Sequence, residues 1–326
     1  MKQKKKIRVA ILFGGKSAEH EVSIRSAKNV LASIDRKKYQ VFPLKIGRDG
    51  KLRQLISFLE KVDVVFPVLH GPMGEDGTVQ GLLKLADIPF VGAGVLGSAV
   101  GMDKDVMKRL LAEAKIKVAD FLVFTKNSGI KFSEVKKRLG LPIFVKPANL
   151  GSSVGISKAR NEKEFRAAVR LAGKFDNKIL IEKYIKGREI ECSVLGNEKP
   201  IASLPGEIIP THEFYSYEAK YIDENGARFE IPAHLSKKVI AEVRALAVRA
   251  FKVLCLEGMA RVDFFLTPQN KVIINEVNTI PGFTNISMYP KLWAASGISQ
   301  PELVDRLIML AIERHQREKL LKTSYD

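Results

Sequence analysis

Short apolar runs alternate with amphipathic stretches over the first third of the chain. Residues 7–12 are apolar apart from Arg8 and lead into Phe13 and two glycines, a pattern that predicts a buried parallel strand ending in a turn. The later alternation of short strands with helical stretches favours an open α/β sheet. The expected strands are residues 7–12, 41–46 and 62–69, and the expected helices are residues 22–34 and 79–86.

Two loops, residues 14–21 and 70–77, follow the first and third of these strands. We expect them to lie together at the carboxyl edge of the sheet, where open α/β folds bind ligands. A glycine-rich stretch from Gly92 to Gly97 indicates the exit from this unit. The pattern therefore predicts a first α/β domain over residues 1–97.

A second group of helices and strands follows, and a third group closes the chain. The second group has expected helices at 104–113, 132–139 and 162–172 and expected strands at 118–124, 143–146 and 179–185. A strand at 189–195, a polar loop at 210–230, a helix at 236–254 and a hairpin come next. The last helix is expected to pack onto a core through Leu303, Leu307, Leu310 and Ala311. Two further domains, 98–187 and 188–326, are predicted.

The composition is that of a globular protein with an unusual net charge. Of the 326 residues, 46% are hydrophobic and 28% are charged, and the formal net charge is +18. Nucleic acid, membrane headgroups, anionic substrates or a merely basic surface would each account for that charge. Cys192 and Cys255 have no CxxC partner, and no apolar run approaches the roughly 20 residues of a membrane span. We expect a soluble, cytoplasmic protein without membrane insertion.

The most informative segment is an acidic hairpin near the C-terminus. A four-residue turn at 267–270 would pair Leu266 with Lys271, and it would set Asp263 opposite Ile274 and Arg261 opposite Glu276. Because side chains alternate between faces, Arg261, Asp263, Glu276 and Asn278 then share one face. Diagonal cross-strand neighbours lie roughly 7–8 Å apart, a gap that one or two metal ions can bridge. Carboxylate and amide oxygens are ligands that suit Mg²⁺. The alternative interpretation is a surface hairpin with scattered charges.

A loop of small residues, Asn149 to Gly155, is a candidate phosphate site. It contains Ser152 and Ser153 and follows a strand that ends near Lys146. Small residues let backbone N–H groups and hydroxyls approach phosphate oxygens closely. Lys146, together with Lys104 at the start of a helix, would supply positive charge to a polyphosphate. A flexible turn and two ordinary surface lysines are the alternative interpretation.

The apolar strand at 179–185 carries a polar pair, Glu182 and Lys183. In an adenine pocket, Glu182 and the backbone of Lys183, Tyr184 and Ile185 would meet the base. Glu189 would then reach the ribose hydroxyls. An exposed strand end would show the same polar pair.

Eight segments, in one order along the chain, carry a specific family resemblance. They are FGGKSAEHEVS from residue 13, LHGPMGEDGTVQG from 69, MDK from 102, VKP from 145, GSSVG from 151, YEAKY from 217, RVD from 261 and NEVNTIPG from 275. In these segments the chain resembles the D-alanine:D-alanine ligases of the ATP-grasp superfamily.

The resemblance implies a fold and an activity. The fold would be α/β, in part α+β, with three ATP-grasp domains. They are an N-terminal open parallel sheet, a small central α+β domain and a C-terminal domain with a mainly antiparallel sheet. The activity would be the ATP-dependent joining of two D-alanine molecules through D-alanyl phosphate, for peptidoglycan precursor synthesis.

The resemblance also assigns the ATP and metal sites. Asp263, Glu276 and Asn278 would hold two Mg²⁺ ions, and Mn²⁺ could take their place. The residues implied to contact ATP are Lys104, Lys146, Ser152, Ser153, Glu182, Lys183, Tyr184, Ile185, Glu189 and Lys220.

The remaining implied roles concern D-alanine. Glu19 would bind the ammonium group of the first D-alanine, with His70 nearby, and a hydrogen-bonded set of Glu19, Ser152 and Tyr221 would close a lid. Lys220 would help to offset the negative charge of the reacting groups. Arg261 and the N–H of Gly282 would stabilise the oxyanion. Ser287 and the N–H of Met288 would receive the carboxylate of the second D-alanine.

The Glu-Ala-Lys-Tyr pattern at 218–221 bears on the second substrate. It is associated with dipeptide-forming members and favours D-alanine over D-lactate or D-serine. A different ATP-grasp carboxylate–amine ligase and a basic nucleic-acid-binding protein on this fold are two further interpretations. A nucleic-acid partner is not expected, because the metal ligands are intact and no interleaved aromatic platform accompanies the basic residues. The family resemblance implies a homodimer.

Overall fold

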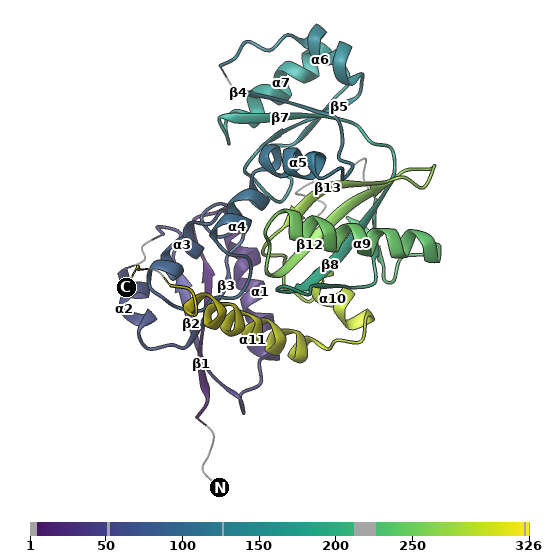
Figure 1. Cartoon of the computed structure of the whole chain (residues 1–326). Helices are drawn as coiled ribbons and strands as arrows, with labels where there is room; N and C mark the ends of the chain where they lie inside the picture. Colours follow the sequence, from purple (N-terminus) through teal and green to yellow (C-terminus); the bar gives the residue numbers. More distant parts are fainter. Residues whose placement is uncertain (1–4, 51–52, 126, 212–225, 323, 326) are drawn as a thin grey trace.

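The described strands form three separate β-sheets in the computed structural model, which covers residues 5–50, 53–125, 127–211, 226–322 and 324–325 (Figure 1). The first sheet has the order β2-β1-β3 and contains β1 (Ile7–Gly14), β2 (Tyr39–Ile46) and β3 (Val64–Val68), all parallel. It confirms the predicted open parallel sheet. Helices α1 (His20–Ser33) and α3 (Thr78–Leu85) were predicted, whereas α2 (Arg53–Leu59) and α4 (Val95–Met102) were not.

Residues 9–12 of strand β1 are continuously apolar because both faces of the strand are covered there. Val9 and Ile11 belong to one buried cluster, and Ala10 and Leu12 belong to another. A strand buried on both faces has no position at which a polar side chain would reach water. The first cluster also contains Leu303 from α11 (Gln300–Lys319), so the last helix of the chain covers one face of the first sheet. The prediction that this helix packs onto a core is confirmed.

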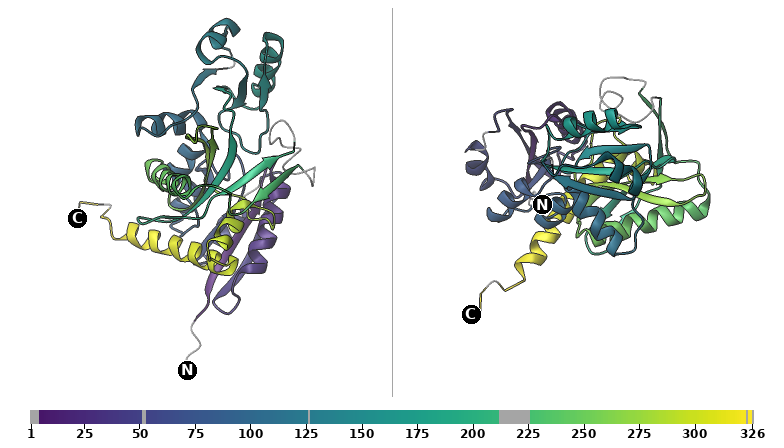
Figure 2. Two further views of the ribbon diagram at one scale, coloured as in Figure 1. Left: turned by 90° about the vertical axis from the view of Figure 1, so that its right-hand side faces the viewer. Right: turned by 90° about the horizontal axis from the view of Figure 1, so that it is seen from above.

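The second sheet is small and antiparallel. It has the order β4-β7-β5-β6 and is preceded by helix α5 (Lys104–Glu113). Helices α6 (Phe132–Leu139) and α7 (Glu162–Ala172) pack on it through Val135, Leu139 and Phe165. Its strands are β4 (Phe121–Thr125), β5 (Ile143–Pro147), β6 (Ser157–Ala159) and β7 (Lys178–Lys183). The views in Figures 1 and 2 show this unit at one end of the molecule.

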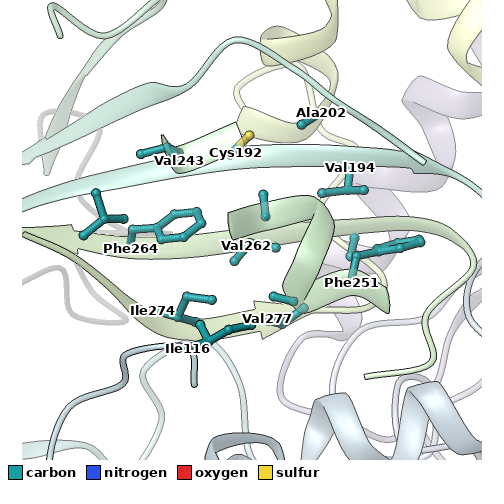
Figure 3. Close-up of a cluster of buried hydrophobic side chains, with 14 of the residues drawn as sticks. Ile116, Cys192, Val194, Ala202, Val243, Phe251, Val262, Phe264, Ile274 and Val277 are labelled. Atoms are coloured by element: carbon teal, nitrogen blue, oxygen red, sulfur yellow. The ribbon is translucent and has the colours of Figure 1, made fainter. Parts of the chain in front are cut away.

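The third sheet is antiparallel and has the order β11-β10-β8-β12-β13, with β9 also paired to β8. Helix α9 (Lys237–Val253) covers one of its faces, where Val243 and Phe251 meet Val262, Phe264 and Ile274 (Figure 3). Its strands are β8 (Arg188–Gly196), β9 (Ile201–Ala202), β10 (Gly206–Pro210), β11 (Ala227–Glu230), β12 (Gly258–Leu266) and β13 (Val272–Asn278). A polar loop was predicted for residues 210–230. This prediction is wrong for residues 227–230, which form β11 and pair with β10.

The first and third sheets are joined by a common apolar core. Trp293 of α10 (Met288–Ala295) lies in the same buried cluster as Val9 of β1 and Met259 of β12. The second sheet has a cluster of its own. Within the described part of the chain, every helix is too short or too polar to cross a lipid bilayer.

Candidate active site

The acidic hairpin of β12 and β13 differs from its predicted register at two points. Leu266 pairs with Val272 rather than Lys271, which moves the register by one residue. A β-bulge beside Asp263 then adds a second shift, so that Asp263 lies opposite Glu276 and Arg261 opposite Asn278. One shift alone would have turned the polar residues to opposite faces, and the second restores the alternation. The predicted pairs are wrong, but the predicted common face is confirmed.

Charged groups on this face are held together by Arg261. Its Nε and Nη2 donate to the two carboxylate oxygens of Asp263 at 2.7 Å each, and its Nε lies 3.0 Å from Glu191 on β8. Asn278 Nδ2 donates to Asp263 at 3.0 Å. Burial alone would lower the pKa of Arg261, but the carboxylates of Asp263 and Glu191 raise the pKa well above its ordinary value. The guanidinium group is therefore always charged.

A cleft of about 380 Å³ lies beside this hairpin, between the second and third sheets. Asp263 and Glu276 line it. The same lining contains most of the residues predicted to contact ATP, namely Lys146, Ser153, Glu182, Lys183, Tyr184, Ile185 and Glu189. The lining of the cleft is therefore partly polar and partly apolar, and it includes the two carboxylates of Asp263 and Glu276.

Glu182 is buried between two ammonium groups. Lys108 Nζ lies 2.7 Å from one carboxylate oxygen, and Lys146 Nζ contacts the other. Burial alone would raise the pKa of Glu182, but the charges of Lys108 and Lys146 outweigh it and the pKa is lowered. The carboxylate is therefore ionised, and it holds Lys146 at the wall of the cleft.

The serine loop, residues 149–155, has a backbone conformation that costs energy. Ser152 and Ser153 have φ angles of 54° and 58°, in the left-handed region that side chains other than glycine seldom adopt. Lys104 Nζ donates to the backbone oxygen of Leu150 in this loop at 2.7 Å and lies 3.5 Å from Glu276. Lys104 is absent from the linings of the cleft and of the cavity described next, and it lies beside them, in contact with the serine loop and Glu276.

A second cavity, of about 150 Å³, lies on the same face of the hairpin, where Arg261, Glu276 and Asn278 line it. Glu276 and Gly151 line both the cleft and this cavity. The cavity also contains most of the residues predicted to bind D-alanine, namely Glu19, His70, Arg261, Gly282, Ser287 and Met288, and it contains Ser152 of the predicted lid. The Ser152 hydroxyl donates to the Glu19 carboxylate, so the serine loop of the second sheet reaches the first loop of the chain.

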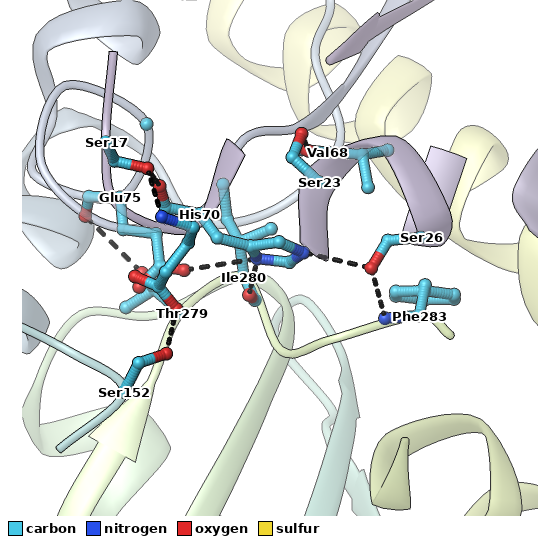
Figure 4. Close-up of polar contacts among 12 residues, drawn as sticks. Ser17, Ser23, Ser26, Val68, His70, Glu75, Ser152, Thr279, Ile280 and Phe283 are labelled. Carbon is cyan, nitrogen blue, oxygen red and sulfur yellow. Dashed lines mark hydrogen bonds and ion pairs between the residues drawn. The ribbon is translucent and has the colours of Figure 1, made fainter. Parts of the chain in front are cut away.

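His70 fixes the two loops of the first sheet to the segment after β13 (Figure 4). Its Nε2 lies 3.1 Å from Ser26 Oγ, and its Nδ1 lies 3.1 Å from the Ile280 oxygen and 3.4 Å from Glu75. Burial alone would lower the pKa of His70, but the Glu75 carboxylate raises it. Ser17 Oγ donates to the His70 oxygen at 2.6 Å, so the predicted meeting of the two loops is confirmed.

The segment from Gly282 to Met288 ends at a helix N-terminus. Ser287 is the N-cap of α10, and Met288 is its first residue. The first N–H groups of a helix have no intrahelical partner and attract anions. A Cβ at Gly282 would lie 2.8 Å from Ser287 Oγ, so only glycine fits without displacing that hydroxyl.

The chain matches two models of one family over most of its length. The model described as D-ala D-ala ligase C-terminus matches residues 110–309, and the model described as D-ala D-ala ligase N-terminus matches residues 8–57 and 52–93. The chain belongs to the D-Ala–D-Ala ligase family. It is 51% identical to the D-alanine–D-alanine ligase of Oceanobacillus iheyensis, in a match that covers 98% of this chain and 99% of the relative.

Solved structures of the D-Ala–D-Ala ligase family have the same fold. The ligase of Coxiella burnetii superimposes with a TM-score of 0.87 at 39% identity, over 97% of this chain and 96% of that one. The Bacillus anthracis ligase complexed with ATP gives a TM-score of 0.84 at 30% identity, over 96% of this chain and 99% of that one. The predicted ATP-grasp fold class is confirmed.

The oxygen donors of the hairpin fit Mg²⁺ in this ligase. Asp263 and Glu276 offer carboxylates and Asn278 an amide oxygen, all hard donors. Among the described residues, no group of three or more acidic, histidine or cysteine side chains forms a complete protein cage. An ion here would share its coordination with water and phosphate oxygens, as Mg²⁺ commonly does.

Some residues of this ligase site were not predicted from the sequence, and two predicted residues, Lys220 and Tyr221, lie outside the described residues. The buried contacts of Lys108 and Glu191 were missed, because an isolated Lys or Glu in a sequence carries no sign of burial. The motif from residue 69 contains Glu75, yet only the fold shows that its carboxylate meets His70.

Proposed function

We propose that this protein joins two D-alanine molecules to form D-alanyl-D-alanine, with conversion of ATP to ADP and phosphate, for peptidoglycan precursor synthesis. The observation that carries the proposal is the meeting of two cavities at Glu276. The cleft of about 380 Å³ suits a nucleotide, and the cavity of about 150 Å³ is of a size for amino acids. A carboxylate in the small cavity would then lie near the terminal phosphate of a nucleotide in the cleft.

The reaction has two balanced steps. The carboxylate of the first D-alanine attacks the γ-phosphorus of ATP, which releases ADP and gives D-alanyl phosphate. The amine of the second D-alanine then attacks the acyl carbon, loses a proton and displaces phosphate. Neither step needs a side-chain nucleophile, so the protein acts through positioning and electrostatics.

The nucleotide end of the site is assigned to the cleft. Glu182, the backbone of Lys183 to Ile185, and Glu189 would bind the nucleoside, and Lys104, Lys146, Ser152, Ser153 and Lys220 would contact the phosphates. Asp263, Glu276 and Asn278 would hold two Mg²⁺ ions, or Mn²⁺ in their place. Mg²⁺ bound there supplies positive charge that offsets the repulsion between the triphosphate and the attacking carboxylate.

The amino acid end is assigned to the small cavity. Glu19 would pair with the ammonium group of the first D-alanine, and His70 would hold the surrounding loops. Arg261 and the Gly282 N–H would donate to the oxyanion that forms in the second step. Ser287 and the Met288 N–H would receive the second carboxylate, a role supported by the N-terminus of α10.

The test of the main proposal is an ADP-coupled assay with ATP, Mg²⁺ and a panel of amino acids. D-alanine alone is expected to support ADP release, with D-alanyl-D-alanine identified by mass spectrometry. Absence of the dipeptide would refute the proposal. A mixed product with D-lactate or D-serine, formed faster than the dipeptide, would favour those second substrates.

A lid formed by Glu19, Ser152 and Tyr221 is the second part of the proposal. Acyl phosphates hydrolyse, so the closed site must exclude water. Tyr221→Phe is expected to leave ADP affinity nearly unchanged, but to lower the ratio of dipeptide to ADP because water reaches the intermediate. Both products are measured in one assay. An unchanged rate and an unchanged ratio would show that the Tyr221 hydroxyl has no part in closure.

We also propose that the protein is a cytoplasmic homodimer with domains at 1–97, 98–187 and 188–326. Leu85 at the end of α3 and Leu96 on α4 are 89% and 62% exposed, which leaves apolar surface available for a second copy. Light scattering is expected to give about twice the 36.3 kDa mass of the chain. A monomeric mass at micromolar concentration would rule the dimer out.

A further inference from the structure

Lys108 is a fully buried lysine to which the proposed reaction gives no role. It lies one turn after Lys104 on α5, and none of its surface is exposed. Its ammonium group contacts Glu182 at 2.7 Å and the backbone oxygen of Asn275 at 3.0 Å. Burial of an ammonium group is costly unless it is paired with an opposite charge and hydrogen-bonded, and the Glu182 ion pair and the Asn275 hydrogen bond meet these needs. They connect strand β7 of the second sheet to strand β13 of the third.

Asn275 is the extra residue of the β-bulge. Ile274 pairs with Phe264 and Glu276 pairs with Asp263, so within the described hairpin Asn275 has no partner residue on β12. This bulge sets Glu276 and Asn278 on the face of Asp263. Strand β13 lies at the edge of its sheet, so β12 is its only neighbouring strand in the described sheet, and residues 117–118 add one parallel bridge at Ile274 on the outer side. The Lys108 ammonium group donates to the backbone oxygen of Asn275, the bulge residue, from helix α5.

Glu182 is the second group that Lys108 holds. Its carboxylate lines the nucleotide cleft, whereas Lys108 does not. Without Lys108, Lys146 would be the one cation among the described residues that contacts Glu182. Its ammonium group would then be drawn toward Glu182 and away from a phosphate. Lys108 thus acts on the cleft through Glu182 and on the carboxylate pair through the bulge.

We propose that Lys108 is a positioning residue that couples the nucleotide cleft to the metal-ligand pair, by holding Glu182 and the Asn275 carbonyl with one ammonium group. The inference rests on the proposed function, because the cleft must bind a nucleotide and Asp263 and Glu276 must bind a metal. Its consequence is that nucleotide binding and Mg²⁺ dependence change together when Lys108 is replaced.

The test is Lys108→Met, which keeps the length and apolar part of the side chain and removes the charge. ADP binding is measured by calorimetry with and without Mg²⁺. We expect weaker ADP binding without Mg²⁺, and a smaller strengthening of ADP binding when Mg²⁺ is added. The Mg²⁺ concentration for half-maximal dipeptide synthesis is expected to rise about 10- to 100-fold, the usual effect of removing a group that orients a metal ligand.

Two matched variants complete the design. Lys108→Arg keeps the charge and is expected to restore part of the Mg²⁺ response. Arg109→Met changes the next residue on the same helix, an exposed side chain paired with Asp105, and is expected to behave as wild type. The thermal unfolding transition of each variant is recorded.

Each result decides the question. A folded Lys108→Met protein with unchanged ADP affinity and unchanged Mg²⁺ dependence would overturn the inference. Loss of the cooperative unfolding transition in both Lys108 variants would also overturn it, because the role would then be in folding. A wild-type protein that binds no ADP or makes no dipeptide would refute the proposed function instead.

Discussion

Replacing Glu276 with glutamine is expected to lower the rate of dipeptide synthesis about a thousandfold at saturating substrates. Glu276 lines both cavities, lies opposite Asp263 and is 3.5 Å from Lys104. Glutamine keeps the shape but removes one of the two carboxylates proposed to hold the metal. Each 1.36 kcal/mol of lost transition-state stabilisation lowers the rate tenfold. Loss of the charge that holds the metal is expected to cost about 4 kcal/mol, which gives the thousandfold decrease.

The matched control is Glu302→Gln on α11, which removes the same charge from a surface pair with Arg306. Its rate is expected to equal that of wild type. Both variants are compared by thermal unfolding and by ADP binding with and without Mg²⁺. If Glu276→Gln keeps more than about a tenth of the wild-type rate, or binds Mg²⁺–ADP as tightly as wild type, Glu276 is not a metal ligand.

The hairpin shows what can and cannot be predicted from the sequence. The alternation of polar and apolar residues identifies the common face of Asp263 and Glu276, because burial of one face specifies it strongly. The pairing of individual residues depends on the turn and on the bulge at Asn275. Neither has a glycine or Asn-Gly signal in this segment. The chemistry of the face was therefore predictable, whereas its register was not.

Contacts between distant segments account for the remaining differences. Strand β11 (Ala227–Glu230) was not predicted because it is short and has one large apolar side chain, Phe229, between Arg228 and Glu230. Its pairing with β10 defines it as a strand. Helix α11 was predicted from its spacing, but its partner, the first sheet, lies at the other end of the chain. Local patterns predict elements better than they predict partners.

Replacing Glu19 with glutamine is expected to raise the KM for the first D-alanine about 10- to 100-fold and to leave ADP affinity unchanged. Glu19 is 9% exposed and lines the small cavity but not the nucleotide cleft. Glutamine can still accept a hydrogen bond from Ser152, so the loop contact is retained. The change removes the charge opposite the substrate ammonium, and a hydrogen bond to a charged group contributes about 1.5–3 kcal/mol.

The control for this variant is Glu21→Gln, two residues along the chain, where the carboxylate forms an exposed surface pair with Arg48. It is expected to leave the KM for D-alanine and the ADP affinity unchanged. Steady-state rates at varied D-alanine, together with ADP calorimetry, separate the two ends of the site. Equal losses of ADP affinity and D-alanine affinity in Glu19→Gln would indicate a general disturbance of the serine loop. An unchanged KM for D-alanine would show that Glu19 does not bind the substrate ammonium group. The charge that holds the first substrate would then have to come from another carboxylate of the same cavity, such as Glu75 beside His70.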